Sequence, residues 1–185
     1  MINVADDVTN KFYVDRKRYT AVWGGQLARI GASGRWYAIP TGHQPASFTL
    51  GTGGTPDTAF TLSSTADDLV PCIWASMHDI TVTGCKIWYG EGGTNSTTHS
   101  VYLMRYEIDA DGDLDNGTIV ANTGSLASDN SSMARALTLS LSGTAANLDI
   151  DFSNNEILIA CINPIDSYNS NLSCKVILEY TEVET

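Results

Sequence analysis

The sequence predicts an all-β protein: a jelly-roll β-sandwich preceded by a small N-terminal extended segment. Only 17% of the 185 residues are charged, and 16 are glycine, a composition typical of short strands joined by frequent turns. From residue 59 onward, about eight or nine short apolar runs follow one another with turn residues between them. None of these runs has a convincing helical period. Eight strands in two sheets is the jelly-roll number, and an immunoglobulin-like sandwich is the alternative, although its Cys–Trp–Cys framework is absent.

Two apolar runs near the C-terminus organise this predicted body. Residues 156–162 are apolar at odd and even positions, which is typical of a strand buried on both faces or covered on one by a partner molecule. Residues 172–181 alternate between apolar and polar side chains, the pattern of a half-buried strand. Pro164 between them cannot continue a central strand, because it has no amide donor. We expect these strands to form the closing hairpin of the sandwich.

The remaining alternations predict the core and one outward aromatic side chain. In residues 79–90 the apolar parity changes at Gly84, where a β-bulge would keep one inner face and direct Trp88 outward. The alternation elsewhere predicts a shared core of Leu137, Leu139, Leu141, Leu148, Ile150, Phe152, Val176, Leu178 and Tyr180.

A stretch rich in glycine and proline predicts the domain boundaries. Residues 1–40 form an N-terminal anchoring segment, residues 41–58 a Gly/Pro/Thr-rich linker or long loop, and residues 59–185 the jelly-roll domain. We also expect synthesis in a cytoplasm, with no signal peptide and no membrane span. The four cysteines are then free thiols by default, and disulfides between neighbouring strands are the alternative.

Charge is distributed unevenly along the chain. The net charge of −11 argues against nucleic-acid binding, yet residues 1–40 hold six basic and three acidic residues. Residues 11–23 interleave basic and aromatic side chains, which is typical of contact surfaces; a first strand with a solvated basic face is the alternative. The candidate partner-binding residues are Lys11, Phe12, Tyr13, Arg16, Lys17, Arg18, Tyr19, Trp36 and Trp88.

No motif predicts catalysis or a cofactor. The acidic run with Asp109, Asp111, Asp113 and Asp115 resembles a calcium loop, but its sixth position holds Leu114 where an EF-hand needs glycine. A hairpin turn built on Asp-Gly is the preferred interpretation, and calcium binding the weaker one. The tryptophans and tyrosines could form a sugar-stacking platform, although core or interface positions are commoner for such residues.

Several segments resemble a known class of proteins. Residues 11–19 (KFYVDRKRY) followed by 34–39 (GRWYAI) resemble the N-terminal region of small virion proteins of tailed phages, especially marine ones. Residues 79–87, 156–162 and 175–180 follow the layout of the same proteins, whose body is similar to the trimeric jelly rolls of the tumour-necrosis-factor and complement globular-head type.

The resemblance implies a function without catalysis. It implies a capsid decoration (cement) protein that binds the major capsid protein and itself, as a homotrimer in the virion. A tail or head fibre protein that recognises a host surface glycan is the first alternative, and a carbohydrate-binding module the second. Neither an enzyme nor a protein that binds nucleic acid or membrane is expected.

Overall fold

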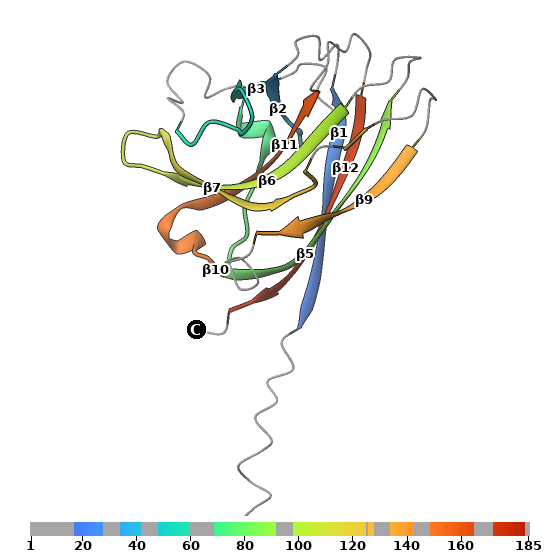
Figure 1. The fold of residues 1–185 in the computed structure, drawn as a ribbon. Coiled ribbons are helices and arrows are strands. Elements are labelled where there is room, and N and C mark those ends of the chain that lie inside the picture. The colour runs from blue at the N-terminus through green and yellow to red at the C-terminus, as the bar shows by residue number, and fades with distance from the viewer. Residues whose placement is uncertain are drawn as a thin grey trace, which may run out of the picture.

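The computed structural model describes residues 17–27, 34–41, 48–59, 69–91, 98–124, 126–127, 134–142, 149–164 and 172–183. These residues are almost entirely antiparallel β-structure, which confirms the predicted all-β fold (Figure 1). The only helices in this part of the chain are two short 3-10 turns, η2 (Val70–Cys72) and η3 (Phe152–Asn154). No helix among the described residues is long and apolar enough to cross a membrane.

Twelve strands make up one strongly curled sheet. They are β1 (Arg18–Leu27), β2 (Arg35–Ala38), β3 (Phe48–Thr52), β4 (Ile73–Trp74), β5 (Ile80–Glu91), β6 (Thr98–Ile108), β7 (Leu114–Asn122), β8 (Leu126–Ala127), β9 (Ala134–Leu141), β10 (Asp149–Ile150), β11 (Glu156–Pro164) and β12 (Leu172–Glu182). Their order along the sheet is β1-β12-β5-β9-β7-β6-β11-β2-β3. Strand β9 pairs with β5 and, at its end, with β7, so it joins two layers.

The pairing is nested, as in a long hairpin that has been rolled up. The first strand pairs with the last (β1 with β12), β2 and β4 pair with β11, β5 pairs with β9, and β6 pairs with β7. This arrangement is jelly-roll-like. We call β1, β12, β5 and β9 the first sheet, and β7, β6, β11, β2, β4 and β3 the second sheet.

The main core lies between the two sheets and contains most of the predicted set. Leu139, Ile150, Val176 and Leu178 are buried there. Leu137, Leu141, Phe152 and Tyr180 are partly buried and pack against it, whereas Leu148 lies outside the described residues.

Strand β11 is buried on both faces, as its sequence predicted. Leu158, Ala160 and Ile162 belong to the main core. Residues of the opposite parity, such as Ile159 and Cys161, belong to a second core on the outer side of the second sheet. The predicted closing hairpin is wrong, however, because β11 pairs with β6, β2 and β4 while β12 pairs with β1 and β5. Strand β11 is apolar on both faces, so it needs a position in the second sheet, where a core lies on each side. Strand β12 has only one apolar face and can lie in the first sheet, whose outer face is exposed.

The second core is covered by the chain itself. Leu69 and Cys72, in and beside η2, are buried in it together with Leu50 of β3. Across the same sheet face, the Tyr106 hydroxyl donates to the Asp57 carbonyl at 2.8 Å, and the Gly117 amide donates to the Thr58 carbonyl at 2.8 Å. The segment around residue 57 therefore crosses the second sheet as a strap.

The N-terminal strands belong to the same sheet as the body. β1 pairs with β12 over all ten of its residues, and β2 pairs with β11 and β3. The expected boundaries at residues 40 and 58 therefore do not mark breaks in the hydrogen-bonded sheet. For residues 18–23, the alternative interpretation as a first strand is the one that agrees with this pairing.

Candidate interaction surface

The outer face of the first sheet exposes large apolar side chains to solvent. Strand register places Val22, Ile177 and Lys86 in one row across β1, β12 and β5. The next row holds Lys175 and Trp88, followed by exposed Ala136 of β9. Val22 is 52% exposed and Trp88 is 48% exposed, and Ile177 between the two strands is half-buried.

A β-bulge directs Trp88 to this face. Glu179 pairs with Gly84, whereas the next residue, Tyr180, pairs with Val82, so Thr83 is an extra residue in β5. The bulge lets Val82 and Ile87 both point into the core although they differ in parity. The predicted bulge and the predicted outward direction of Trp88 are both confirmed.

The charges on this face are mainly positive. Lys86 Nζ lies 3.6 Å from Glu179 Oε1, and both side chains are about half exposed. Lys175 is exposed, and among the described residues it forms no ion pair. Arg18 is also exposed, at the beginning of β1. The outward positions of the first sheet therefore carry a positive excess on a protein whose net charge is −11.

An open hollow of about 570 Å³ lies beside Lys175. Gly24, directly opposite Lys175 on β1, has a φ of 149°, and a Cβ there would collide with the Cys174 carbonyl oxygen. Glycine is therefore required at this position. The hollow itself is lined by Val22, Gln26 and Lys175, and also by Thr41, which follows β2. The face therefore presents the exposed Trp88 indole, and the hollow lies at its β1 edge.

An aromatic cluster closes the sandwich where β1 faces β4. The Trp23 and Trp74 rings are stacked with their centroids 5.6 Å apart, and Tyr180 meets Trp74 edge-on at 5.6 Å. Tyr19 stacks on Tyr180 at 5.5 Å. Desolvation, together with the Glu182 carboxylate that accepts its hydroxyl hydrogen bond, raises the pKa of Tyr19. The Tyr19 hydroxyl therefore stays protonated at physiological pH.

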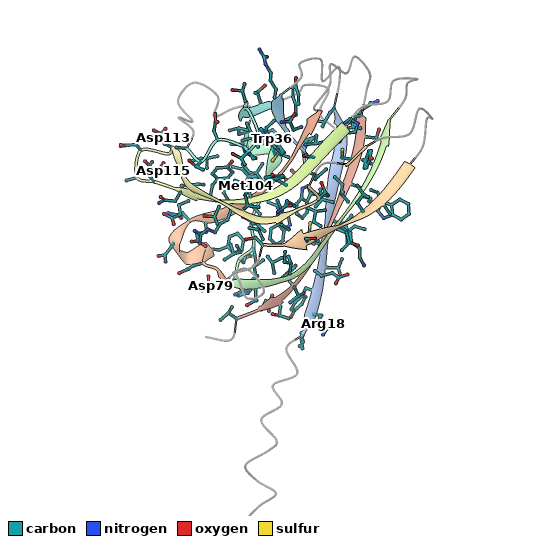
Figure 2. All side chains as sticks on the ribbon, in the orientation of Figure 1. Arg18, Trp36, Asp79, Met104, Asp113 and Asp115 are labelled. Atoms are coloured by element: carbon teal, nitrogen blue, oxygen red, sulfur yellow. The ribbon has the colours of Figure 1, made fainter. Side chains whose placement is uncertain are left out.

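The predicted partner-binding residues have different fates. Lys17 and Arg18 are exposed and Tyr19 is half-buried (Figure 2 labels Arg18, at the beginning of β1). The predicted contacts within residues 11–16 lie outside the described residues. Trp36 is a correction: it is fully buried in the second core, and its Nε1 donates to the Gly53 carbonyl at 3.1 Å. Its ring packs against Tyr102 with centroids 4.5 Å apart and is fully buried, so it has no free face for a partner.

The acidic run forms a hairpin turn between β6 and β7, as preferred from its sequence. Asp109 Oδ1 accepts hydrogen bonds from the amides of Asp111 at 2.9 Å and Asp113 at 2.8 Å. Gly112 adopts a φ of 87°, which glycine tolerates. No group of three or more His, Cys, Asp or Glu side chains within the described ranges is arranged to hold a metal ion. The Asp109 carboxylate is engaged in building the turn.

The four cysteines are free thiols buried in the two cores, which answers the question of disulfides. Burial raises the pKa of Cys85 and of Cys174 to about 12, and it raises the pKa of Cys161 well above the ordinary range. A reactive thiol needs the opposite, a lowered pKa and solvent access. These cysteines act as small core side chains.

Sequence reasoning missed two parts of the surface. Val22 stands at the opposite parity from the core residue Trp23, which was a usable signal for outward direction. The consecutive glycines Gly24 and Gly25 in a strand were a signal for close backbone approach. Placing these residues beside Trp88 required the register of three strands.

Comparisons with known proteins identify no family. No family model matches the chain, and no curated protein matches it. Seven chains among solved structures match it, including one from the crystal structure of the T13 IBDV viral particle. That chain has 9% sequence identity and a TM-score of 0.27, with 91% of this chain and 40% of the viral chain covered. This chain thus spans well under half of the viral chain, and a likeness so distant says nothing about function.

Proposed function

We propose that the protein is a non-enzymatic virion structural protein, a decoration protein of a phage head, that binds neighbouring proteins through the outer face of its first sheet. The observation that carries the proposal is the pair of half-exposed side chains Val22 and Trp88 on that face. Exposed apolar groups that gather on one face mark interaction sites. Large aromatic residues are enriched in interface cores.

The composition of the face suits protein binding. Trp88 can supply most of the contact area, while Lys175 and Lys86 at its sides can pair with carboxylates of a partner. The nearby cysteine, Cys174, is protonated and buried, so it offers no nucleophile to this face. The resemblance of residues 11–19 and of the body segments to phage virion proteins supports a virion location.

The N-terminal arm is proposed as a second attachment element. Its described end consists of the exposed residues Lys17 and Arg18, next to Tyr19, which stacks on Tyr180. In the proposal, Arg16, Lys17 and Arg18 pair with acidic groups of the major capsid protein, and Phe12, Tyr13 and Tyr19 fill shallow apolar pockets. Arginine suits this role because its planar fork matches a carboxylate.

A fibre protein that recognises a host glycan is the second candidate. The half-buried aromatic rings of Tyr19, Tyr180 and Trp74 favour it, because partly exposed rings can stack on sugars. A carbohydrate-binding module outside a virion would use the same edge. Binding of the purified protein to a glycan array, lost in Tyr180→Ala and retained in Trp88→Ala, would favour these candidates.

Labelling of virions tests the proposal directly. A C-terminal label should lie over the head facets; a label confined to the tail would support the fibre candidate, and absence from purified virions would refute both virion roles. Particles lacking the native protein can then be incubated with variants. Val22→Ala with Trp88→Ala should reduce incorporation, whereas Val70→Ala, a matched change at a valine 62% exposed elsewhere, should not. Equal incorporation of these variants would exclude the first-sheet face.

A further inference from the structure

We propose that the acidic β6–β7 hairpin of one copy docks on the outer face of the first sheet of a second copy. The inference uses the interaction surface of the proposed function but does not depend on a virion, since it concerns the protein alone in solution. It names the partner as another copy of this chain and the contact as head-to-tail.

Charge complementarity is the first argument. Residues 107–116 contain five acidic residues and no basic one. The docking face instead presents Lys175 and Lys86, with Glu179 the acid already paired to Lys86. Two such faces placed against each other would bring like charges together, which disfavours a symmetric face-to-face contact. The hairpin offers the opposite sign.

The hairpin is also preorganised for binding. Besides the two amide hydrogen bonds to Asp109, Asn116 has a φ of 54° and donates from Nδ2 to Glu107 Oε2 at 2.7 Å. A turn held in this way loses little conformational entropy when it docks. Asp111 and Asp115 remain exposed, so their carboxylates are available to a partner.

The two surfaces lie on different sides of the molecule. Figure 2 places Asp113 and Asp115 at the tip of the β6–β7 hairpin, away from the strands β1, β12, β5 and β9. One copy can therefore donate its hairpin and receive another at the same time. Such a heterologous contact closes into a ring when its rotation permits, or continues as an open array.

The receiving face has room for the tip. The hollow of about 570 Å³ at the β1 edge is lined by Lys175, so a carboxylate that enters it can approach the ammonium group. At the tip, Ala110 and Gly112 are small, so the turn backbone can approach the Trp88 indole closely. The contact thus pairs opposite charges around a small apolar centre.

The test uses two variants that each lose one half of the contact. The face variant is Trp88→Ala with Lys175→Ala, and the hairpin variant is Asp111→Asn with Asp115→Asn, which spares the turn-building Asp109. Sedimentation velocity at tens of micromolar and low salt should show the parent associated. Each variant alone should be monomeric, with an unchanged melting temperature.

Mixing the two variants decides the geometry. The face variant still has an intact hairpin and the hairpin variant still has an intact face, so the mixture should form a one-to-one dimer and nothing larger. The exposed-valine change Val70→Ala should associate like the parent. A hairpin variant that associates like the parent, or a mixture that stays monomeric, would overturn the head-to-tail contact. A monomeric parent would also overturn it, and its incorporation into virus particles would leave the proposed function standing.

Discussion

The outer face of the second sheet is covered by other parts of the chain, whereas the outer face of the first sheet is exposed to solvent. On the second sheet, the chain lays its own strap and the buried residues Leu69 and Cys72 over the outer face. On the first sheet, Val22 and Trp88 stay about half exposed. The difference follows from strand pattern: β11 is apolar on both faces and demands an internal cover, whereas β12 alternates and does not. The exposed Trp88 is therefore an exception among the mostly polar outward positions of the first sheet, and binding to a partner would explain it.

Replacing one tryptophan on each side should give the largest contrast. Trp36→Ala should lower the free energy of unfolding by about 3–5 kcal/mol, because it removes a fully buried ring and leaves a cavity. Trp88→Ala should change it by less than about 0.5 kcal/mol in the monomer, as is usual at exposed positions. Urea unfolding at a concentration where the protein is monomeric measures both. Similar losses at the two sites would mean that Trp88 is a structural residue, and the interaction surface would have to be abandoned.

Burial could be predicted from the sequence better than strand partners could. Alternation identified Leu178 and Ile150 as core residues, and the uniform apolarity of residues 156–162 indicated a strand covered on both faces. The same patterns do not say which strand lies alongside. The predicted hairpin of β11 and β12 was wrong for this reason, since rolling up a long hairpin places sequence neighbours in opposite sheets.

The candidate surface was predictable only in part. Trp88 followed from its parity and from the bulge at Gly84, because both depend on local alternation. Trp36 was misplaced because it is buried by residues distant in sequence, such as Leu50 and Met104, which a local pattern does not reveal. The hollow beside Gly24 and its neighbour Lys175 come from the register of β1 against β12, a long-range property.

Two ion pairs, one largely buried in the second sheet and one exposed on the first sheet, allow the same comparison for charged side chains. Arg105 Nη1 lies 3.0 Å from Glu156 Oε1, with only 9% of the Glu156 side chain exposed, and Glu156 Oε2 accepts from the Asp151 amide at 2.8 Å. Glu156→Ala should cost about 2–4 kcal/mol, because it leaves a largely buried guanidinium and an amide without their partner.

The exposed pair on the first sheet provides the matched control. Glu179→Ala removes the partner of Lys86, with both side chains about half exposed, and should cost between about 0 and 1 kcal/mol. Thermal unfolding of both variants at two salt concentrations measures the difference. A larger loss at Glu179 than at Glu156 would contradict the assignment of the first-sheet face as a solvated surface.

The comparison with the smallest expected difference tests whether water is excluded from the main core beneath the first sheet. Burial raises the pKa of Cys174 from 9.0 to about 12. A folded-state pKa above the unfolded value stabilises the protein fully below about pH 9, and that contribution is lost as pH rises towards 12. Between pH 9 and 10 the parent should therefore lose about 1 kcal/mol more unfolding free energy than Cys174→Ala does. Cys161→Ala, in the self-covered second core, should show the same reduced pH dependence, because its thiol pKa is raised for the same reason. Urea unfolding at the two pH values gives the comparison. Cys174→Ala could instead lose as much unfolding free energy between pH 9 and 10 as the parent does, while Cys161→Ala does not. That result would mean that water reaches the main core but not the second core.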